Sequence, residues 1–134
     1  MLVRLTAALV LGLSLPAVAG DAAKGETDFK KCKSCHSITA ADGTEVVKGG
    51  KTGPNLFSIV GNPVASSPDY KYGEGILAAK TAGAVWDEAG LATYLADPGK
   101  WVKAASGDDA AKSKMTFKLS KGGEDMAAYL ATLH

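Results

Sequence analysis

Two cysteines and a histidine stand close together in the run Cys32-Lys-Ser-Cys35-His36. Two thiols separated by two residues can each form a thioether with one of the two vinyl groups of a single porphyrin. The next side chain, the imidazole of His36, then lies where it can ligate the iron of that porphyrin. The spacing therefore predicts covalent attachment of one c-type haem through Cys32 and Cys35, with His36 as an axial ligand.

Other classes of protein also use a Cys-x-x-Cys pair. A redox dithiol normally follows a strand in a βαβ unit, and no such pattern surrounds this pair. A structural disulfide needs no neighbouring histidine. A zinc site needs four ligands, and the chain has two cysteines and two histidines, the second being the last residue, His134. These alternatives stay open in the sequence, but haem attachment explains more of its features.

A six-coordinate iron needs a second axial ligand, for which the sequence offers Met115, Met126 and His134. Met126 falls on the apolar stripe of the last expected helix, which is typical of a core residue. His134 ends the chain, where a solvated side chain is expected. Met115 lies between Lys114 and Thr116 in an expected loop, where no apolar face accounts for it. Because a His/Met pair is the usual ligation of haem electron carriers, we predict Met115 as the second ligand.

Residues 1–19 have the features of a secretory signal peptide. A positively charged start is followed by an apolar run that ends at Leu15, and Ala17-Val-Ala19 is a small-residue cleavage site. An uncleaved membrane anchor is the alternative, but the run is shorter than the roughly 20 apolar residues that a spanning helix needs. We expect cleavage after Ala19, which leaves residues 20–134 as a single periplasmic domain without an anchor.

Charge is balanced in total but not along the chain. The formal net charge is +1, and it falls to zero when Arg4, the only arginine, leaves with the predicted leader. This total gives no reason to expect nucleic-acid binding. Lysines nevertheless gather near the first cysteine and ahead of the expected last helix, at positions 30, 31, 33, 112, 114, 118 and 121. A neutral domain can therefore carry a basic face.

Periodicity and capping residues predict an all-α fold without strands. Helices are expected over four segments, at about residues 22–33, 72–80, 87–96 and 120–133. Asp21 and Asp87 are N-cap residues, and Pro98 should stop the third helix. Residues 39–55 and 103–119 are expected to be mostly loop. Such a scaffold buries little apolar surface by itself, so a haem would fill its middle.

Over residues 20–134 the chain resembles the class I cytochromes c, most closely the bacterial cytochromes c2. The likeness runs in order through the stretches Gly20–Gly25, Cys32–His36, Thr52–Leu56, Lys114–Phe117 and Gly123–Leu130. It implies a small cytochrome c fold, with about four to five short helices and long loops wrapped around one covalent haem. It also implies that the first and last helices cross closely at Gly25.

The same resemblance assigns roles to residues around the haem. The carbonyl of Pro54 would accept the Nδ1–H of His36 and fix its tautomer. Tyr72 and Trp86 would hydrogen-bond a haem propionate, with core filling as the alternative role. Tyr94 would approach the methionine sulfur.

The resemblance implies a soluble, monomeric electron carrier and not an enzyme. Electrons would arrive from a quinol-oxidising cytochrome bc complex and leave to a photosynthetic reaction centre or a terminal oxidase. The lysines named above would surround the haem edge and dock acidic partners, with scattered solubilising lysines as the alternative. A five-coordinate haem enzyme or gas-binding sensor is the rival function. Asn62 departs from the family pattern, which often has an arginine there to compensate a buried propionate.

Overall fold

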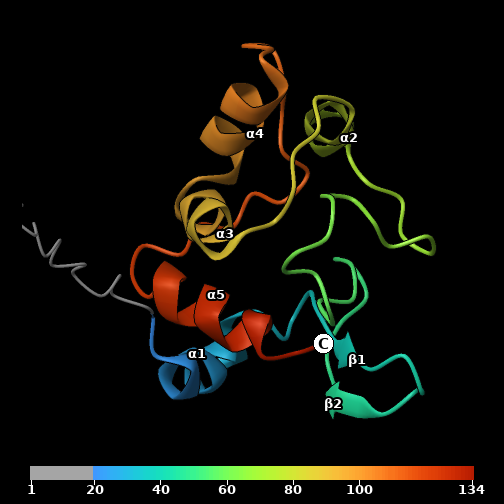
Figure 1. Cartoon of the computed structure of the whole chain (residues 1–134), viewed down its shortest axis with the longest axis vertical. Helices are drawn as coiled ribbons and strands as arrows, with labels where there is room; N and C mark the ends of the chain where they lie inside the picture. The colour runs from blue at the N-terminus through green and yellow to red at the C-terminus, as the bar shows by residue number, and fades with distance from the viewer. Residues whose placement is uncertain (1–19) are drawn as a thin grey trace, which may run out of the picture.

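The computed structural model describes residues 20–134. The predicted leader, residues 1–19, lies outside these residues, so its cleavage stays a prediction. The described chain contains five α-helices, a 3-10 turn and a two-stranded antiparallel sheet (Figure 1). Their bounds are α1 Ala22–Asp28, η1 Phe29–Lys31, β1 Ile38–Thr39, β2 Glu45–Val47, α2 Glu74–Thr81, α3 Glu88–Ala96, α4 Pro98–Ser106 and α5 Gly123–Ala131.

The helices begin where the sequence places capping residues. The carboxylate of Asp21 accepts the Lys24 N–H at 3.2 Å, and that of Asp87 accepts the Gly90 N–H at 2.6 Å. Each contact satisfies a backbone donor that has no partner within its own helix. The predicted caps of the first and third expected helices are therefore confirmed, and the all-α character of the fold is confirmed apart from the small sheet.

Helix α4 was not expected from the sequence; its last four residues extend into the segment 103–119, the rest of which is loop as predicted. Asp97 accepts the Lys100 N–H at 3.1 Å, and Pro98 occupies the first turn, where its missing N–H costs nothing. Gly107 then ends the helix in the left-handed region, at φ +71°. Pro98 therefore ends α3, as predicted, and also begins α4.

The expectation that the chain has no strand is wrong for one hairpin. Ile38 pairs with Val47 across the two strands, and Gly43 takes up the turn between them with φ +88°. The strands span two and three residues, too few to show a period of two in the sequence. The hairpin follows the Cys-x-x-Cys-His run directly.

The core is built by a row of helices in which each packs on the next. In spatial order, α1 packs on α5, α5 on α3, α3 on α4, and α4 on α2 (Figure 1). The most deeply buried side chains come from this stack and from the segments beside it, and include Phe29, Ile38, Val64, Val102 and Met126. Within residues 20–134 no helix is both long and apolar enough to cross a membrane.

Helices α1 and α5 cross in close contact at Gly25. A Cβ built on Gly25 would lie 2.0 Å from the carbonyl oxygen of Asp125, so only glycine fits there. Asp125 also accepts the Asp21 N–H at 2.8 Å and pairs with the Lys24 ammonium at 3.2 Å. The backbone N–H of Asp21, followed by Lys24, holds the pKa of the Asp125 carboxyl below its usual value. The first and last helices are thereby joined.

Replacing Gly25 with alanine tests this crossing. We expect Gly25→Ala to lower the free energy of unfolding by about 2–3 kcal/mol, because the new methyl group forces the two backbones apart. Thermal and denaturant unfolding of the holoprotein would measure the loss. Gly99→Ala is the matched control, since its Cβ would lie an ordinary 3.6 Å from the Asp97 carboxylate. Equal stability of the two variants would contradict the close crossing.

Candidate functional site

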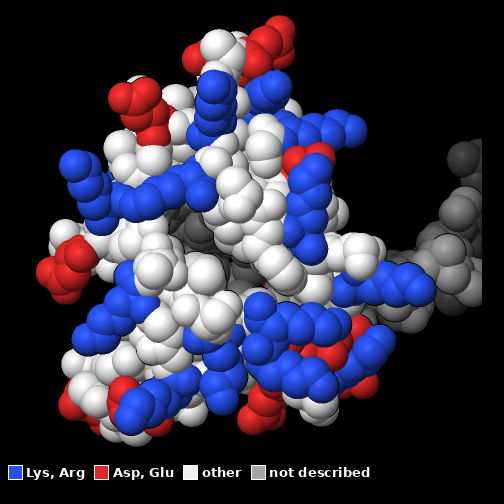
Figure 2. Space-filling model, turned by 180° about the vertical axis from the view of Figure 1, so that it is seen from behind, with Lys and Arg blue, Asp and Glu red and all other residues white. Residues whose placement is uncertain are grey.

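A cavity of about 590 Å³ opens beside the Cys-x-x-Cys-His run. Its walls are mainly apolar, and its volume lies within the range of ordinary cofactor sites. Figure 2 shows a hollow near the centre of one face, with lysine side chains on several sides of it. Two of the lysines that line the cavity are Lys31 and Lys114. A large flat cofactor could therefore enter the fold and keep one edge near solvent.

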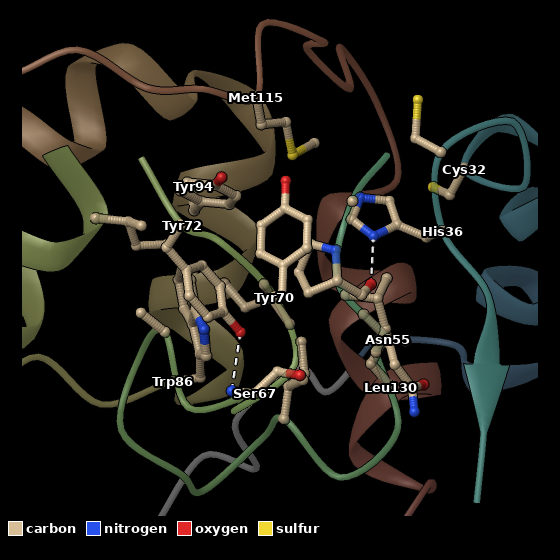
Figure 3. Close-up of a pocket in the computed structure, with 18 of the residues that line it drawn as sticks. Cys32, His36, Asn55, Ser67, Tyr70, Tyr72, Trp86, Tyr94, Met115 and Leu130 are labelled. Atoms are coloured by element: carbon tan, nitrogen blue, oxygen red, sulfur yellow. Dashed lines mark hydrogen bonds between the residues drawn. The ribbon is translucent and has the colours of Figure 1, made fainter. Parts of the chain in front are cut away.

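The imidazole of His36 is held from one side of the cavity by residues 52–54, which we call the proximal strap. Its Nδ1 lies 2.8 Å from the carbonyl oxygen of Pro54, which accepts the Nδ1–H (Figure 3). A Cβ built on Gly53 would lie 2.3 Å from the Cε1 of His36, so the strap lies directly against the ring. The tautomer that donates from Nδ1 carries its lone pair on Nε2, where a metal binds.

Burial also prepares His36 as a ligand. Desolvation lowers the pKa of the imidazole, and the hydrogen bond to Pro54 opposes this only in part. The ring is therefore neutral at neutral pH, as metal ligation requires.

The two thiols differ in their surroundings. Both are free and both line the cavity, but Cys32 is buried whereas Cys35 is exposed. Burial raises the pKa of the Cys32 thiol. Hydrogen bonding, first with Thr52 and then with Ser34, lowers the pKa of the Cys35 thiol. Neither thiol is withdrawn from the cavity, so both can reach one bound group.

The alternatives to haem attachment find little support in this geometry. Within residues 20–134 no three His, Cys, Asp or Glu side chains lie together as a metal cluster, so the ligands of a zinc site are not assembled. The strand pair next to the cysteines is an antiparallel hairpin and not part of a βαβ unit.

Met115 enters the cavity from residues 113–117, which we call the distal strap. Figure 3 shows its sulfur and the imidazole of His36 directed into the same part of the cavity from different segments. Met115 is half-buried, whereas Met126 is 1% exposed within the core and His134 is exposed at the end of the chain. Of the three candidate ligands, Met115 is therefore the one in a strap beside the cavity and outside the helical core.

The predicted aromatic residues line the same cavity. Trp86 and Tyr94 are nearly buried and meet edge to face, with their ring centroids 4.9 Å apart. Burial raises the pKa of the Tyr94 phenol, so it stays a neutral hydroxyl. The hydroxyl of Tyr72 accepts the Ser67 N–H at 3.0 Å. These side chains form a largely dry wall that offers a few hydroxyl and N–H groups.

Sequence reasoning missed two aromatic residues near this wall. Trp101 stacks on Trp86 with 4.7 Å between ring centroids. It lies in α4, which was not predicted. Tyr70 lines the cavity and donates its hydroxyl to the carbonyl oxygen of Thr52 at 2.7 Å. The spacing of Tyr70 two residues before Tyr72 is the one local pattern that could have identified Tyr70 as a cavity residue.

Asn62, where the resemblance leads to an expectation of arginine, lines the cavity. Its side-chain amide donates to the carbonyl oxygen of Ser58 at 2.5 Å, and its own carbonyl accepts the Trp86 N–H at 2.9 Å. The residue ties two loop segments together but brings no positive charge to the cavity.

Comparison with known proteins identifies close relatives. No protein-family model matches the sequence. Cytochrome c2 of Rhodobacter capsulatus is 55% identical over 99% of this chain and 98% of its own length. Cytochrome c-550 of Paracoccus versutus is 57% identical over 90% of this chain and 81% of its own length.

Solved structures of such proteins share the fold. The structure of cytochrome c2 from Rhodobacter capsulatus matches with a TM-score of 0.82 at 56% identity, covering 84% of this chain and 97% of that one. Ferric cytochrome c-550 from Paracoccus versutus also matches with a TM-score of 0.82, at 53% identity, covering 85% of this chain and 98% of that one.

The residues around the cavity fit the group that this kinship implies. Two free thiols, an imidazole with its Nε2 available and a thioether all reach one apolar cavity. The group is one covalent haem c attached through Cys32 and Cys35, and the activity is electron transfer and not enzymatic conversion of a substrate. The chain belongs to the class I cytochromes c, among the cytochromes c2 and c-550.

Proposed function

We propose that the chain is a periplasmic one-electron carrier whose haem iron is ligated by His36 and Met115. It would accept electrons from a quinol-oxidising cytochrome bc complex and pass them to a photosynthetic reaction centre or a terminal oxidase. The observation that carries the proposal is that the His36 imidazole, supported by the proximal strap, and the Met115 sulfur, on the distal strap, reach one cavity (Figure 3).

The identity of the iron ligands distinguishes an electron carrier from the rival function, a five-coordinate haem enzyme or gas sensor. With His36 and Met115 on the iron, no coordination position stays vacant for oxygen, peroxide or a gas. A five-coordinate haem enzyme or gas sensor would require Met115 to stay off the iron. The half-buried position of Met115 beside the cavity and the soft character of its sulfur favour the carrier, because thioether ligation raises the potential of haem iron.

The residues of this chain keep the site unchanged while an electron passes. Bound haem supplies the ferric and ferrous states of its iron. Pro54 holds the orientation of His36, while Trp86 and Tyr94 exclude water from the cavity wall. A rigid, dry surrounding limits the rearrangement that accompanies each change of charge.

The same proposal includes a lysine-rich docking face around the haem edge and a monomeric state. Two of the predicted docking lysines form ion pairs, Lys31 with Asp28 at 3.7 Å and Lys118 with Asp97 at 3.2 Å. Both pairs are substantially exposed, so they weaken the positive field only in part. Lysine side chains surround the hollow in Figure 2, which favours a basic face over scattered lysines.

Cleavage of a leader after Ala19 also belongs to the proposal. The first described residue, Gly20, already packs on α5, since a Cβ there would lie 2.1 Å from the carbonyl oxygen of Glu124. Gly20, which would be the first residue of the mature chain, is thus part of the packed domain.

Replacing Met115 tests the ligand pair. We expect Met115→Ala to keep its covalent haem, to lower the midpoint potential by roughly 0.2 V and to bind carbon monoxide rapidly in the ferrous state. Redox titration and flash photolysis would measure both effects. Met126→Leu is the matched control, because it replaces a core methionine with a side chain of similar volume. A wild-type potential in Met115→Ala would show that another group ligates the iron.

Replacing each histidine in turn tests the attachment site. We expect His36→Ala to abolish accumulation of the haem-bound protein, whereas His134→Ala should mature normally because its side chain is exposed. Intact mass spectrometry of exported protein would report the haem adduct. The same spectrum would show whether residues 1–19 have been removed. Normal yields of haem-bound His36→Ala would contradict the role of this histidine.

Salt dependence tests the docking face. We expect the rate of electron transfer to an isolated reaction centre or oxidase to fall about tenfold from low to physiological ionic strength. Lys33→Gln should reduce this dependence, whereas Lys103→Gln, on α4 and not among the proposed docking lysines, should not. Stopped-flow kinetics across a salt series would measure the slopes. A rate that does not change with salt would refute electrostatic steering.

A further inference from the structure

The Tyr70 side chain contacts both the proximal strap, which supports His36, and the distal strap, which carries Met115. Its hydroxyl donates to the carbonyl oxygen of Thr52, in the proximal strap, at 2.7 Å. Its ring lies under the ammonium of Lys114, in the distal strap, with 4.6 Å from Nζ to the ring centroid. All three residues line the cavity. One half-buried side chain therefore connects segments that lie on two sides of the haem site.

The contact on the distal strap restrains the residue next to the proposed ligand. The ammonium of Lys114 also donates to the carbonyl oxygen of Lys71 at 2.8 Å, so it is fixed by an oxygen as well as by the ring. Lys114 directly precedes Met115. Displacement of the strap backbone at Met115 therefore strains the cation–π contact and the hydrogen bond of the neighbouring lysine.

The contact on the proximal strap restrains the support of His36. Thr52 directly precedes Gly53, whose N–H donates to the carbonyl oxygen of Cys35 at 2.8 Å and whose backbone lies against the imidazole. The Tyr70 hydroxyl thus adds an external hydrogen bond to a short strap that is otherwise tied to the attachment site itself.

Tyr70 is itself held in place. Its ring meets that of Tyr72 edge to face, with 4.9 Å between centroids, and the hydroxyl of Tyr72 accepts the Ser67 N–H. The loop that carries Tyr70 is therefore braced independently of the two straps, and can transmit a restraint from one strap to the other.

We infer that Tyr70 is a positioning residue that locks the distal strap to the proximal strap at the cavity mouth. Through this lock it keeps Met115 on the iron and slows the entry of small ligands. The inference rests on the proposed His36 and Met115 ligation for its effect at the iron, but the link between the straps does not depend on which group ligates.

The rate at which imidazole binds the iron of the ferric holoprotein measures how firmly the lock holds Met115. Imidazole is uncharged above neutral pH, so loss of a lysine charge does not itself change its approach. We expect entry to be faster by about fivefold in Tyr70→Phe, which loses only the hydroxyl, and by about twentyfold in Tyr70→Leu. Lys114→Leu should also accelerate entry, and in the Tyr70→Leu background it should add less than its single effect.

Lys118→Leu is the matched control for Lys114→Leu. It removes a lysine close by in the chain, whose ammonium contacts Asp97 and not the tyrosine. Its entry rate should stay within about twofold of wild type, the level expected from loss of an exposed ion pair. A wild-type entry rate in Tyr70→Leu, or fully multiplicative effects of the Tyr70 and Lys114 substitutions, would overturn the lock.

Amide hydrogen exchange separates failure of the lock from failure of the ligand assignment. In the holoprotein, Tyr70→Phe should accelerate exchange of the Gly53 amide about fivefold, because the strap loses its external hydrogen bond. This readout does not involve Met115. Faster Gly53 exchange without any change in imidazole entry would refute control of the iron by Tyr70, and unchanged exchange would refute the link itself. Failure of the ligand proposal would instead appear in the Met115→Ala potential.

Discussion

The orientation of one imidazole governs the rest of this structure. His36 follows Cys35 directly, so the attachment site fixes the backbone but leaves the ring free to turn. The hydrogen bond to Pro54 selects the tautomer of the imidazole. Because Gly53 has no side chain, the backbone of the strap can lie against the ring. Any side chain at Gly53 would displace the imidazole, because its Cβ would lie 2.3 Å from Cε1. The proximal strap therefore sets the direction in which the Nε2 of His36 would bind the haem iron.

The crossing of α1 and α5 also positions residues of the haem site. Cys32 follows the 3-10 turn that continues α1, so the position of α1 fixes that of the thiols. Helix α5 clamps α1 at Gly25 and also contributes Met126 and Leu130 to the cavity lining. The same helix pair thus determines the stability of the crossing and the shape of the haem site. A substitution at Gly25 should therefore alter both.

Local patterns in the sequence predict those features that depend on residues close together in the chain. Asp21 and Asp87 cap helices within three residues of themselves, and the Cys-x-x-Cys-His spacing carries its chemistry in five positions. Pro98 was interpreted only as a stop, because a proline at a helix boundary can belong to either side of it. The hairpin strands are too short to show a period. The contacts of Tyr70 join residues far apart in the chain, which no local pattern encodes.

An electron carrier faces opposing demands at the mouth of its haem site. The edge of the haem must stay accessible to partners, yet both ligands must keep their places in either oxidation state. The buried core can hold the ligands only from behind, since helices α3 and α5 line the inner walls. A brace at the exposed rim must therefore come from side chains that tolerate water. Tyr70 and Lys114 meet this need, because a phenol ring and an ammonium interact through contacts that persist at a half-exposed surface. Lys114 then holds the distal strap while keeping its charge near the proposed docking face, so that one residue would contribute to both demands.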